Sequence, residues 1–120
     1  MRGALVGEGN LDDRRSMVAL MFWGRFFVAK RDVVLAMCDD DLLDKRIGDG
    51  RLQITVSKRF YGEKLIGSEA DAVKYLGKCT IGNIIGKRIV ALAEKNGFIT
   101  KENILLIGGV PHAQFVKLKV

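Results

Sequence analysis

The hydrophobic and polar positions near the start of the chain predict a β-hairpin followed by a short helix. Phe22–Lys30 is rich in aromatic and branched residues, which favour strands. Arg31-Asp32 supplies a short turn, and Val33–Cys38 is the partner strand. Asp39–Lys45 predicts one or two helical turns, because acidic residues stand at its N-terminal end and the basic Lys45 and Arg46 stand at the other.

A third strand and a capped helix are predicted next. After a turn at Gly48–Gly50, three apolar residues alternate with polar ones, as in a half-buried strand: Leu52, Ile54 and Val56. Ser68 then begins a helix that runs to about Leu76. Asp71 stands three residues after Ser68, which is the spacing of a capping box.

The longest predicted helix spans Ile81–Asn96, with Thr80 as its N-cap and Gly97 just beyond its C-terminus. At helical spacing its large apolar residues share one side and small residues flank them: Ile81, Ile85, Ile89 and Leu92, with Gly82, Gly86 and Ala93. We interpret the small residues as a surface for close packing. Asn83 and Lys87 lie on the opposite side, where contact with an anion or phosphate is the alternative interpretation.

The C-terminal pattern is a pair of strands, Ile104–Ile107 and Phe115–Val120, separated by Gly108–Gln114. The predicted order is therefore three strands, two helices and two strands, with a minor early helix. This order predicts an α+β fold. We expect a two-layer sandwich, in which a mostly antiparallel sheet has helices packed on one face.

Length and charge favour one basic globular domain. The chain has 120 residues, 48% of them hydrophobic, which is enough for one core. We expect residues 1–20 to form a flexible N-terminal extension, with Met17 or Met21 as alternative starts, and residues 21–120 to form a single α+β domain. The net charge of +6 belongs to the second part, because residues 1–20 carry equal numbers of acidic and basic side chains. This balance is compatible with RNA and also with ordinary solubility charge.

The sequence also argues against several classes of protein and site. Its apolar runs are short and interrupted, so no transmembrane helix and no membrane partner are predicted. Cys38 and Cys79 stand far apart without a second ligand pair, which argues against a zinc site and a disulfide framework. We expect a cytoplasmic protein with reduced thiols, no metal and no cofactor.

The C-terminal segment Gly108–Gln114 is the first candidate site, because it holds the chain's single proline and single histidine. The predicted ligand-binding residues are Gly108, Gly109, Pro111, His112 and Gln114, with Thr80, Asn83 and Tyr61 as polar neighbours if the fold gathers them. His112 is the candidate catalytic residue, since its unperturbed pKa lies near neutrality. A hydrogen-bonded structural histidine in a tight turn is the alternative.

Basic residues beside aromatic ones mark a second candidate site, for nucleic acid. Lys58 and Arg59 precede Phe60 and Tyr61, a composition that can hold a phosphate and stack a base. The alternative is an anchored turn with Phe60 buried and Tyr61 half buried. Two further basic residues on the predicted long helix complete the candidate set: Lys87 and Arg88.

The sheet offers another possible nucleic-acid surface. Alternation places aromatic and basic residues together on two strand faces: Trp23, Arg25 and Phe27 on one, and Phe115, Lys117 and Lys119 on the other. If these faces coincide and point to solvent, they form a platform for single strands. If helices cover them, the aromatic residues belong to the core.

Two familiar phosphate and RNA motifs are excluded. Gly77–Thr80 is similar to the end of a P-loop, but Ala72 replaces the required glycine and Cys79 replaces the hydroxyl residue after the lysine. Ile81–Gly86 is similar to the glycine clamp of KH domains, but one residue too many separates its glycines.

Three segments in this order resemble a known family: Ser57–Gly62, Thr80–Gly86 and Gly108–Gln114. The family is the small archaeal one known as domain of unknown function 424. The likeness covers roughly residues 21–120, including the early hairpin and the stretch Asp39–Leu43.

The resemblance implies an α/β two-layer fold and an archaeal, cytoplasmic protein. Family members typically begin near Met21, which supports a separate extension before it. The family brings no established activity, so no catalytic residue is carried over. Glu63 departs from the family pattern, because a second glycine often follows the Phe-Tyr-Gly segment there. A glycine-lined pocket at this position is therefore not expected.

These observations lead to three functional hypotheses. The first is a small RNA-associated binding module linked to translation, based on Lys58, Arg59, Lys87 and Arg88 in a basic domain. The second is an enzyme or small-ligand-binding protein with a site around His112. The third is a protein-interaction subunit, which an exposed apolar patch would mark. The oligomeric state stays open.

Overall fold

The structure is a computed structural model that describes residues 21–117. The predicted N-terminal extension, the alternative start at Met17 and the residue Lys119 lie outside the described residues. One sheet occupies the centre. Its strands are β2 (Phe22–Ala29), β3 (Asp32–Asp39), β6 (Lys64–Ile66), β7 (Ile81–Ile85), β8 (Ile104–Ile107) and β9 (Val110–Val116).

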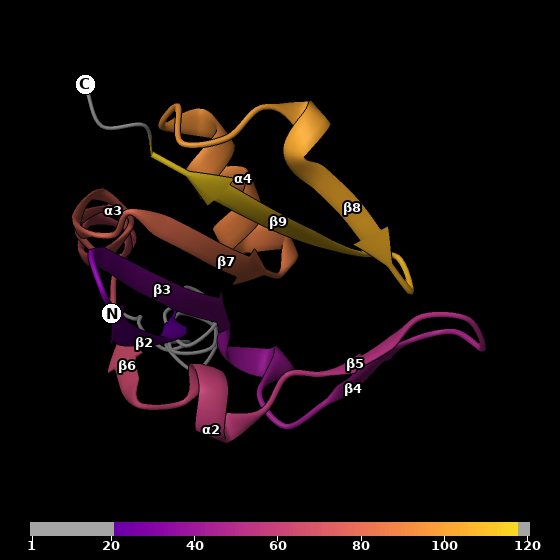
Figure 1. The fold of residues 1–120 in the computed structure, drawn as a ribbon. Coiled ribbons are helices and arrows are strands. Elements are labelled where there is room, and N and C mark those ends of the chain that lie inside the picture. Colours follow the sequence, from indigo (N-terminus) through magenta and orange to yellow (C-terminus); the bar gives the residue numbers. More distant parts are fainter. Residues whose placement is uncertain (1–20, 118–120) are drawn as a thin grey trace, which may run out of the picture.

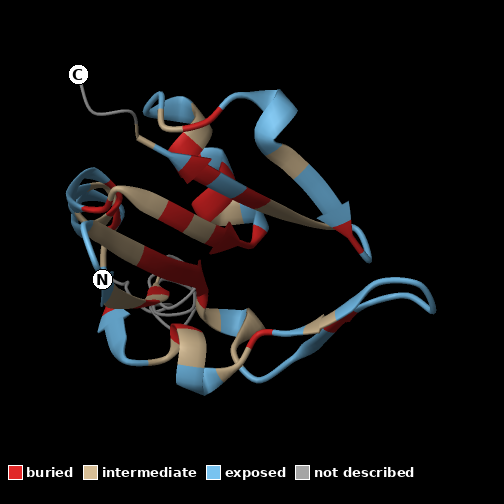
Figure 2. Cartoon of the chain, in the orientation of Figure 1, coloured by how far each residue is buried: buried red, intermediate tan, exposed pale blue. Residues whose placement is uncertain are grey.

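These strands form a mixed six-stranded sheet in the order β6-β2-β3-β7-β9-β8 (Figure 1). β3 and β7 pair in parallel, and the other neighbours are antiparallel. The two parallel strands lie in the middle and are the most buried, whereas β8 at the edge is largely exposed (Figure 2). The α+β class expected from the sequence is confirmed.

Two helices, α3 (Glu69–Lys78) and α4 (Lys87–Lys95), pack against one face of the sheet. The core on this face joins buried residues of both helices to alternate residues of the strands, among them Leu35, Ile84, Phe115, Leu76 and Ile89. Within the described part of the chain, every helix is too short or too polar to cross a membrane.

The opposite face carries a smaller core. The short helix α2 (Lys58–Tyr61) and the hairpin of β4 (Arg46–Gly48) and β5 (Gln53–Thr55) lie on this side, with the hairpin reaching away from the sheet (Figure 1). Their buried residues meet those of the sheet: Ile47, Val56 and Tyr61 pack with Ala36, Cys38, Ile85 and Ile107. Two 3-10 turns complete the fold: η1 (Asp40–Leu42) and η2 (Lys101–Asn103).

The early hairpin and the start of α3 are confirmed. β2 and β3 pair along eight residues each, and the hydroxyl of Ser68 accepts a hydrogen bond from the Asp71 amide at 3.1 Å. The predicted helix at Asp39–Lys45 is only the 3-10 turn η1. The short strands β4 and β6 lack a clear alternation pattern and were not predicted.

The predicted helix Ile81–Asn96 is wrong in its first part. Ile81–Ile85 is the central strand β7, and the helix begins only at Lys87. The small residues have other roles than packing between helices. Gly82 leaves room for the ring of Phe115, which packs across the strand where a Cβ would be.

Gly86 separates the strand from the helix. Its φ of 128° is a conformation that side chains disfavour, and a Cβ there would collide with the carboxylate of Asp39. That carboxylate caps α4 from the end of β3: it accepts hydrogen bonds from the amides of Arg88 at 2.9 Å and Ile89 at 2.8 Å. The helix start is therefore fixed by a residue far away in the sequence, 49 positions before the Arg88 amide that it accepts from.

The C-terminal turn is shorter than predicted. Only Gly108 and Gly109 form it, with φ of 57° and 80°, and the signs fit a two-residue type I′ hairpin. Val110–Gln114 belongs instead to β9. The proline and the histidine are consequently strand residues whose side chains point to opposite faces.

We predict that Gly86→Ala costs about 2–4 kcal/mol of the free energy of unfolding, because it adds backbone strain and disturbs the buried Asp39 cap. Urea unfolding followed by circular dichroism measures this change. Gly77→Ala is the matched control: Gly77 lies in α3 with open space where a Cβ would stand, so this variant gains up to about 1 kcal/mol. Equal stability of the two variants would contradict the role assigned to Gly86.

Candidate functional site

A groove of about 480 Å³ lies on the face of the sheet opposite α3 and α4. Alternation along β7 and β9 points Asn83 and Gln114 into it, and the two are direct cross-strand partners. α2 contributes Phe60, and η2 contributes Asn103. The apolar part of its lining comes mainly from Val34, Ile81 and Val116.

Asn83 is the polar centre of this groove. Its Oδ1 accepts a hydrogen bond from the hydroxyl of Tyr61 at 2.9 Å and lies 3.1 Å from Nε2 of His112. Because Oδ1 only accepts, His112 must donate through Nε2, and its Nδ1 carries the lone pair. The three residues come from α2, β7 and β9, and the position of β7 between β3 and β9 in the sheet brings them together.

The two donors fix the orientation of the Asn83 carboxamide. With Oδ1 held by Tyr61 and His112, the Nδ2 group is the end left for a ligand. Within residues 21–117 neither Nδ2 of Asn83 nor the amide of Gln114 has a protein hydrogen-bond partner. The groove therefore presents one oriented amide donor group and a second carboxamide that no hydrogen bond from the described residues holds.

Burial shapes the proton chemistry beside the groove. It lowers the pKa of His112 below 6.5, so the imidazole is neutral at pH 7. Burial also raises the pKa of the Tyr61 phenol, and it raises that of the nearby Cys38 thiol to about 12, with Asp39 adding to the rise. Tyr61 and Cys38 are thus held protonated and serve as neither base nor nucleophile at neutral pH.

The candidate catalytic role of His112 gains no support from its surroundings. In the described part of the chain, its hydrogen-bond partner is the amide of Asn83 rather than a carboxylate or a nucleophile. The same residues contain no group of three or more His, Cys, Asp or Glu placed to hold a metal. The arrangement fits recognition by hydrogen bonds better than proton transfer.

α2 places two cations next to the groove. Lys58 and Arg59 are exposed and immediately precede Phe60, and Ser57 caps this helix by accepting from the Phe60 amide at 3.1 Å. Neither side chain forms an ion pair within residues 21–117. The Phe60 ring stacks on Phe27 at 5.2 Å between centroids. The anchored-turn alternative predicted a buried Phe60 and a half-buried Tyr61. The structure reverses this order, because Tyr61 is 5% exposed and Phe60 is half-buried.

Lys87 and Arg88 lie away from this groove, at the start of α4. Arg88 is held by acidic side chains: its Nη2 lies 2.6 Å from Oδ1 of Asp40 and 3.6 Å from that of Asp41, and its Nη1 donates to the carbonyl of Met21. Lys87 is exposed beside it. The four predicted nucleic-acid residues therefore do not form one surface.

The aromatic and basic platform that the sequence offered as a possible nucleic-acid surface across β2 and β9 does not form. Trp23 and Phe27 pack on the groove side, whereas Phe115 packs beneath α3 and α4. The two strand faces are therefore on opposite sides of the sheet. Lys117 is engaged as well, since its Nζ donates to the carbonyl of Leu76 at 2.7 Å.

The remaining predicted site residues lie elsewhere. Thr80 bridges to β3, where its hydroxyl donates to Asp32 at 2.9 Å and accepts from the Val33 amide. Gly108 packs against Gly48 of the β4–β5 hairpin. Pro111 lies on the helix side of β9, and its carbonyl accepts from the Gly86 amide. Gly109 is exposed at the turn, and Glu63 is exposed after α2.

Sequence reasoning missed part of the groove because it assigned Ile81–Ile85 to a helix. Val34, Ile81 and Val116 line the groove without any distinguishing polar signal. Asn103 caps η2 by accepting from the Thr100 amide, a role that the Thr-x-x-Asn spacing could have indicated.

We predict that acidification destabilises the protein through His112. Its folded pKa lies below the unfolded value near 6.5, so the unfolded state binds the proton first and stability falls as pH drops below about 6.5. His112→Gln, which keeps a donor toward Asn83, removes this part of the pH dependence. Urea unfolding of both proteins from about pH 7 to about pH 5 measures it.

An NMR titration of the single imidazole gives the folded pKa directly. A folded pKa above that of an unstructured histidine, or a wild type that gains stability over His112→Gln on acidification, would contradict the prediction.

Comparisons with known proteins identify a similar fold and the family of the chain. A crystal structure of an uncharacterized conserved protein from Methanopyrus kandleri superposes with a TM-score of 0.69 at 23% identity, covering 83% of this chain and 96% of that one. No curated protein matches the chain. The family model described as "Protein of unknown function (DUF424)" matches residues 28–118. The resemblance found in the sequence is confirmed, and the chain belongs to this family.

Proposed function

We propose that the protein is a small RNA-associated binding module, a two-layer domain that uses the sheet face opposite α3 and α4 to hold unpaired nucleotides. The observation that carries the proposal is the groove itself, in which the oriented amide of Asn83 and the side-chain amide of Gln114 lie beside an aromatic ring and two cations that form no ion pair within residues 21–117.

Base recognition is the task suited to the groove floor. Carboxamides carry both donors and an acceptor, which match the edges of unpaired bases. Holding Asn83 by two hydrogen bonds before the ligand arrives reduces the entropy lost on binding. Phe60 lines the groove, and its ring offers a surface for base stacking.

Phosphate contact is the task suited to α2. Lys58 and Arg59 are exposed on the same short helix as Phe60, so a strand whose base enters the groove runs past both cations. Arg25 adds positive charge behind them, because its Nη1 donates to the carbonyl of Arg59 at 3.2 Å. Arg88 takes no part, since its charge is balanced by Asp40 and Asp41.

The proposal includes a cytoplasmic location and a link to translation. It is supported by the basic balance of the domain and by two free, buried thiols, which suit a reducing compartment. The cytoplasmic location and the link to translation are proposed only together with the RNA partner.

A second candidate function uses the same groove for a small uncharged ligand. The convergence of Tyr61 and His112 on Asn83 favours it, because such preorganised polar groups are typical of small-molecule sites. This candidate needs no contribution from Lys58 or Arg59, which separates it from the first.

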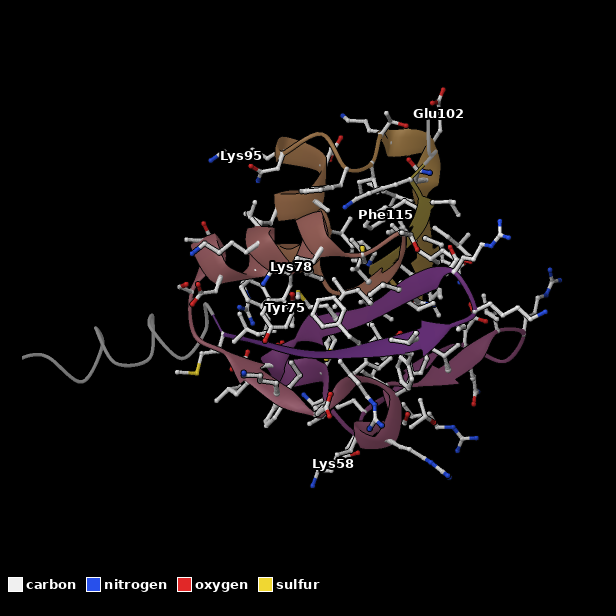
Figure 3. The ribbon with its side chains drawn as sticks, turned by 60° about the vertical axis from the view of Figure 1, so that its left-hand side comes forward. Lys58, Tyr75, Lys78, Lys95, Glu102 and Phe115 are labelled. Carbon is white, nitrogen blue, oxygen red and sulfur yellow. The ribbon has the colours of Figure 1, made fainter. Side chains whose placement is uncertain are left out.

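We predict that single-stranded RNA binds with an affinity that falls steeply with salt, and that Lys58→Ala/Arg59→Ala reduces the salt slope by about 1.4 by removing two phosphate contacts. Fluorescence anisotropy with labelled RNA across a salt series measures both quantities. Lys78→Ala/Lys95→Ala is the matched control, since Lys58 lies on the other side of the sheet from these lysines (Figure 3). The control keeps the wild-type affinity and slope.

The outcomes of that series separate the two functions. Equal losses in both double variants would mean that only net charge matters and would contradict a defined surface. No binding at any salt would exclude RNA. In that case, nucleoside-induced shifts of the His112 NMR signals would support the small-ligand function.

We predict that Gln114→Ala weakens the discrimination among short homopolymers of A, U, C and G by about 1–3 kcal/mol while leaving the salt slope unchanged. Gln114 is exposed and makes no side-chain hydrogen bond within the described residues, so its removal does not disturb the fold. Gln53→Ala, an exposed glutamine on the β4–β5 hairpin, is the control. Identical base preference in wild type and Gln114→Ala would contradict base reading in the groove.

A further inference from the structure

We infer that β8 is a self-complementary edge strand, through which two copies of this chain pair to extend their sheets into one. The inference rests on the backbone and side chains of β8 and does not depend on RNA binding. Among the described residues, β8 pairs with β9 on one side and with nothing on the other, and it forms the outer edge of the sheet (Figure 1).

The hairpin register determines which backbone groups of β8 face outward. Ile107 and Val110 are partners across the two-residue turn, so they form a hydrogen-bonded pair. Leu106 and Pro111 come next and form a non-hydrogen-bonded pair, which agrees with proline's missing N–H and with the use of the Pro111 carbonyl by Gly86 on the other side. Both polar groups of Leu106 therefore point away from β9.

Ile104 is the next β8 residue whose backbone groups point outward, and one of these groups already has a partner. The amide of Ile104 donates to the carbonyl of Lys101 at the end of η2, which leaves the Ile104 carbonyl free. Leu106 is consequently the one β8 residue that offers both a donor and an acceptor at the edge. An antiparallel copy centred on Leu106 satisfies both groups at once, because each Leu106 donates to and accepts from its counterpart.

The side chains of β8 suit an apolar partner. Leu105 is 54% exposed on the groove side and Leu106 is 63% exposed on the helix side, and the strand carries no charge. Natural edge strands commonly carry a lysine, a proline or a bulge that blocks pairing. β8 has none of these, whereas the opposite edge strand β6, which is similarly short, carries Lys64.

The backbone of Leu106 favours a second copy as the occupant, because its outward donor and acceptor are both satisfied by the same residue of a twofold mate. The two uncharged β8 strands also meet without opposing like charges. In the register centred on Leu106, the two Leu106 side chains are opposite each other, and Leu105 is opposite the other copy's Ile107. The twofold axis is then perpendicular to the sheet, so both copies present their grooves on the same side.

We predict that the full chain dimerises reversibly and that Leu106→Lys abolishes the dimer by placing two lysines opposite each other. Sedimentation equilibrium over a range of concentrations measures the mass, which moves toward twice the chain mass of 13.3 kDa for the wild type and stays at that of one chain for the variant. Val28→Lys, at an 80% exposed position on β2, keeps the wild-type behaviour.

A cysteine variant tests the register. Paired Cα atoms in a hydrogen-bonded pair lie about 5.5 Å apart, so two cysteines at this position lie within reach of a short thiol-reactive cross-linker. Leu106→Cys is therefore captured as a covalent dimer by such a reagent, and Val28→Cys is not. The native Cys38 and Cys79 are buried and do not compete.

A wild type that stays monomeric at every concentration would overturn the inference. Hydrogen exchange at the Leu106 amide then identifies the reason. Slow exchange in a monomer would mean that another segment of the same chain covers the edge, and fast exchange would mean that the edge is open to a different partner.

Discussion

The buried carboxylate of Asp39 is the interaction on which the central architecture depends. It ends β3, it caps α4 through the amides of Arg88 and Ile89, and it occupies the space where a side chain at residue 86 would be. Burial raises its pKa, and the two amide hydrogen bonds and Arg88 act against that rise. Hydrogen bonds to a charged group contribute about 1.5–3 kcal/mol each, so the cap stabilises a helix start that has no capping side chain of its own.

This cap also decides what the groove contains. Because β7 must end at Gly86, the alternation along Ile81–Ile85 is set, and Asn83 points away from the helices. Its partner strand β9 then aligns Gln114 with Asn83. The same cap places Arg88 at the helix start, where its guanidinium forms ion pairs with Asp40 and Asp41 directly after β3. A cation that looks available for RNA in the sequence is thus a structural one, and the exposed cations of α2 are those left for a ligand.

Local patterns predicted the parts of the fold that local forces determine. The hairpin of β2 and β3, the Ser68 cap and the paired C-terminal strands follow from propensity, alternation and turn chemistry. The isoleucines of residues 81–89 fit a strand and a helix equally well, and the contact that decides between them joins Gly86 to Asp39. The site shows the same division. Tyr61, Asn83 and His112 were recognisable as polar candidates, but only the pairing of β7 with β3 and with β9 brings them together, whereas Thr80 bonds to Asp32.

The way in which Asn83 is held argues for recognition as the work of this groove. A catalytic site needs a group whose proton is free to move, and here the Tyr61 phenol has a raised pKa, while His112 is kept neutral and donates to an amide. What these two residues accomplish is to fix one end of a carboxamide and leave the other end exposed in the groove. Because the Asn83 side chain is ordered before a ligand arrives, binding costs less conformational entropy. The ordered carboxamide lies between the ring of Phe60 and the amide of Gln114. In the binding module that we propose, a fixed donor in that position selects among ligands by the acceptors they carry.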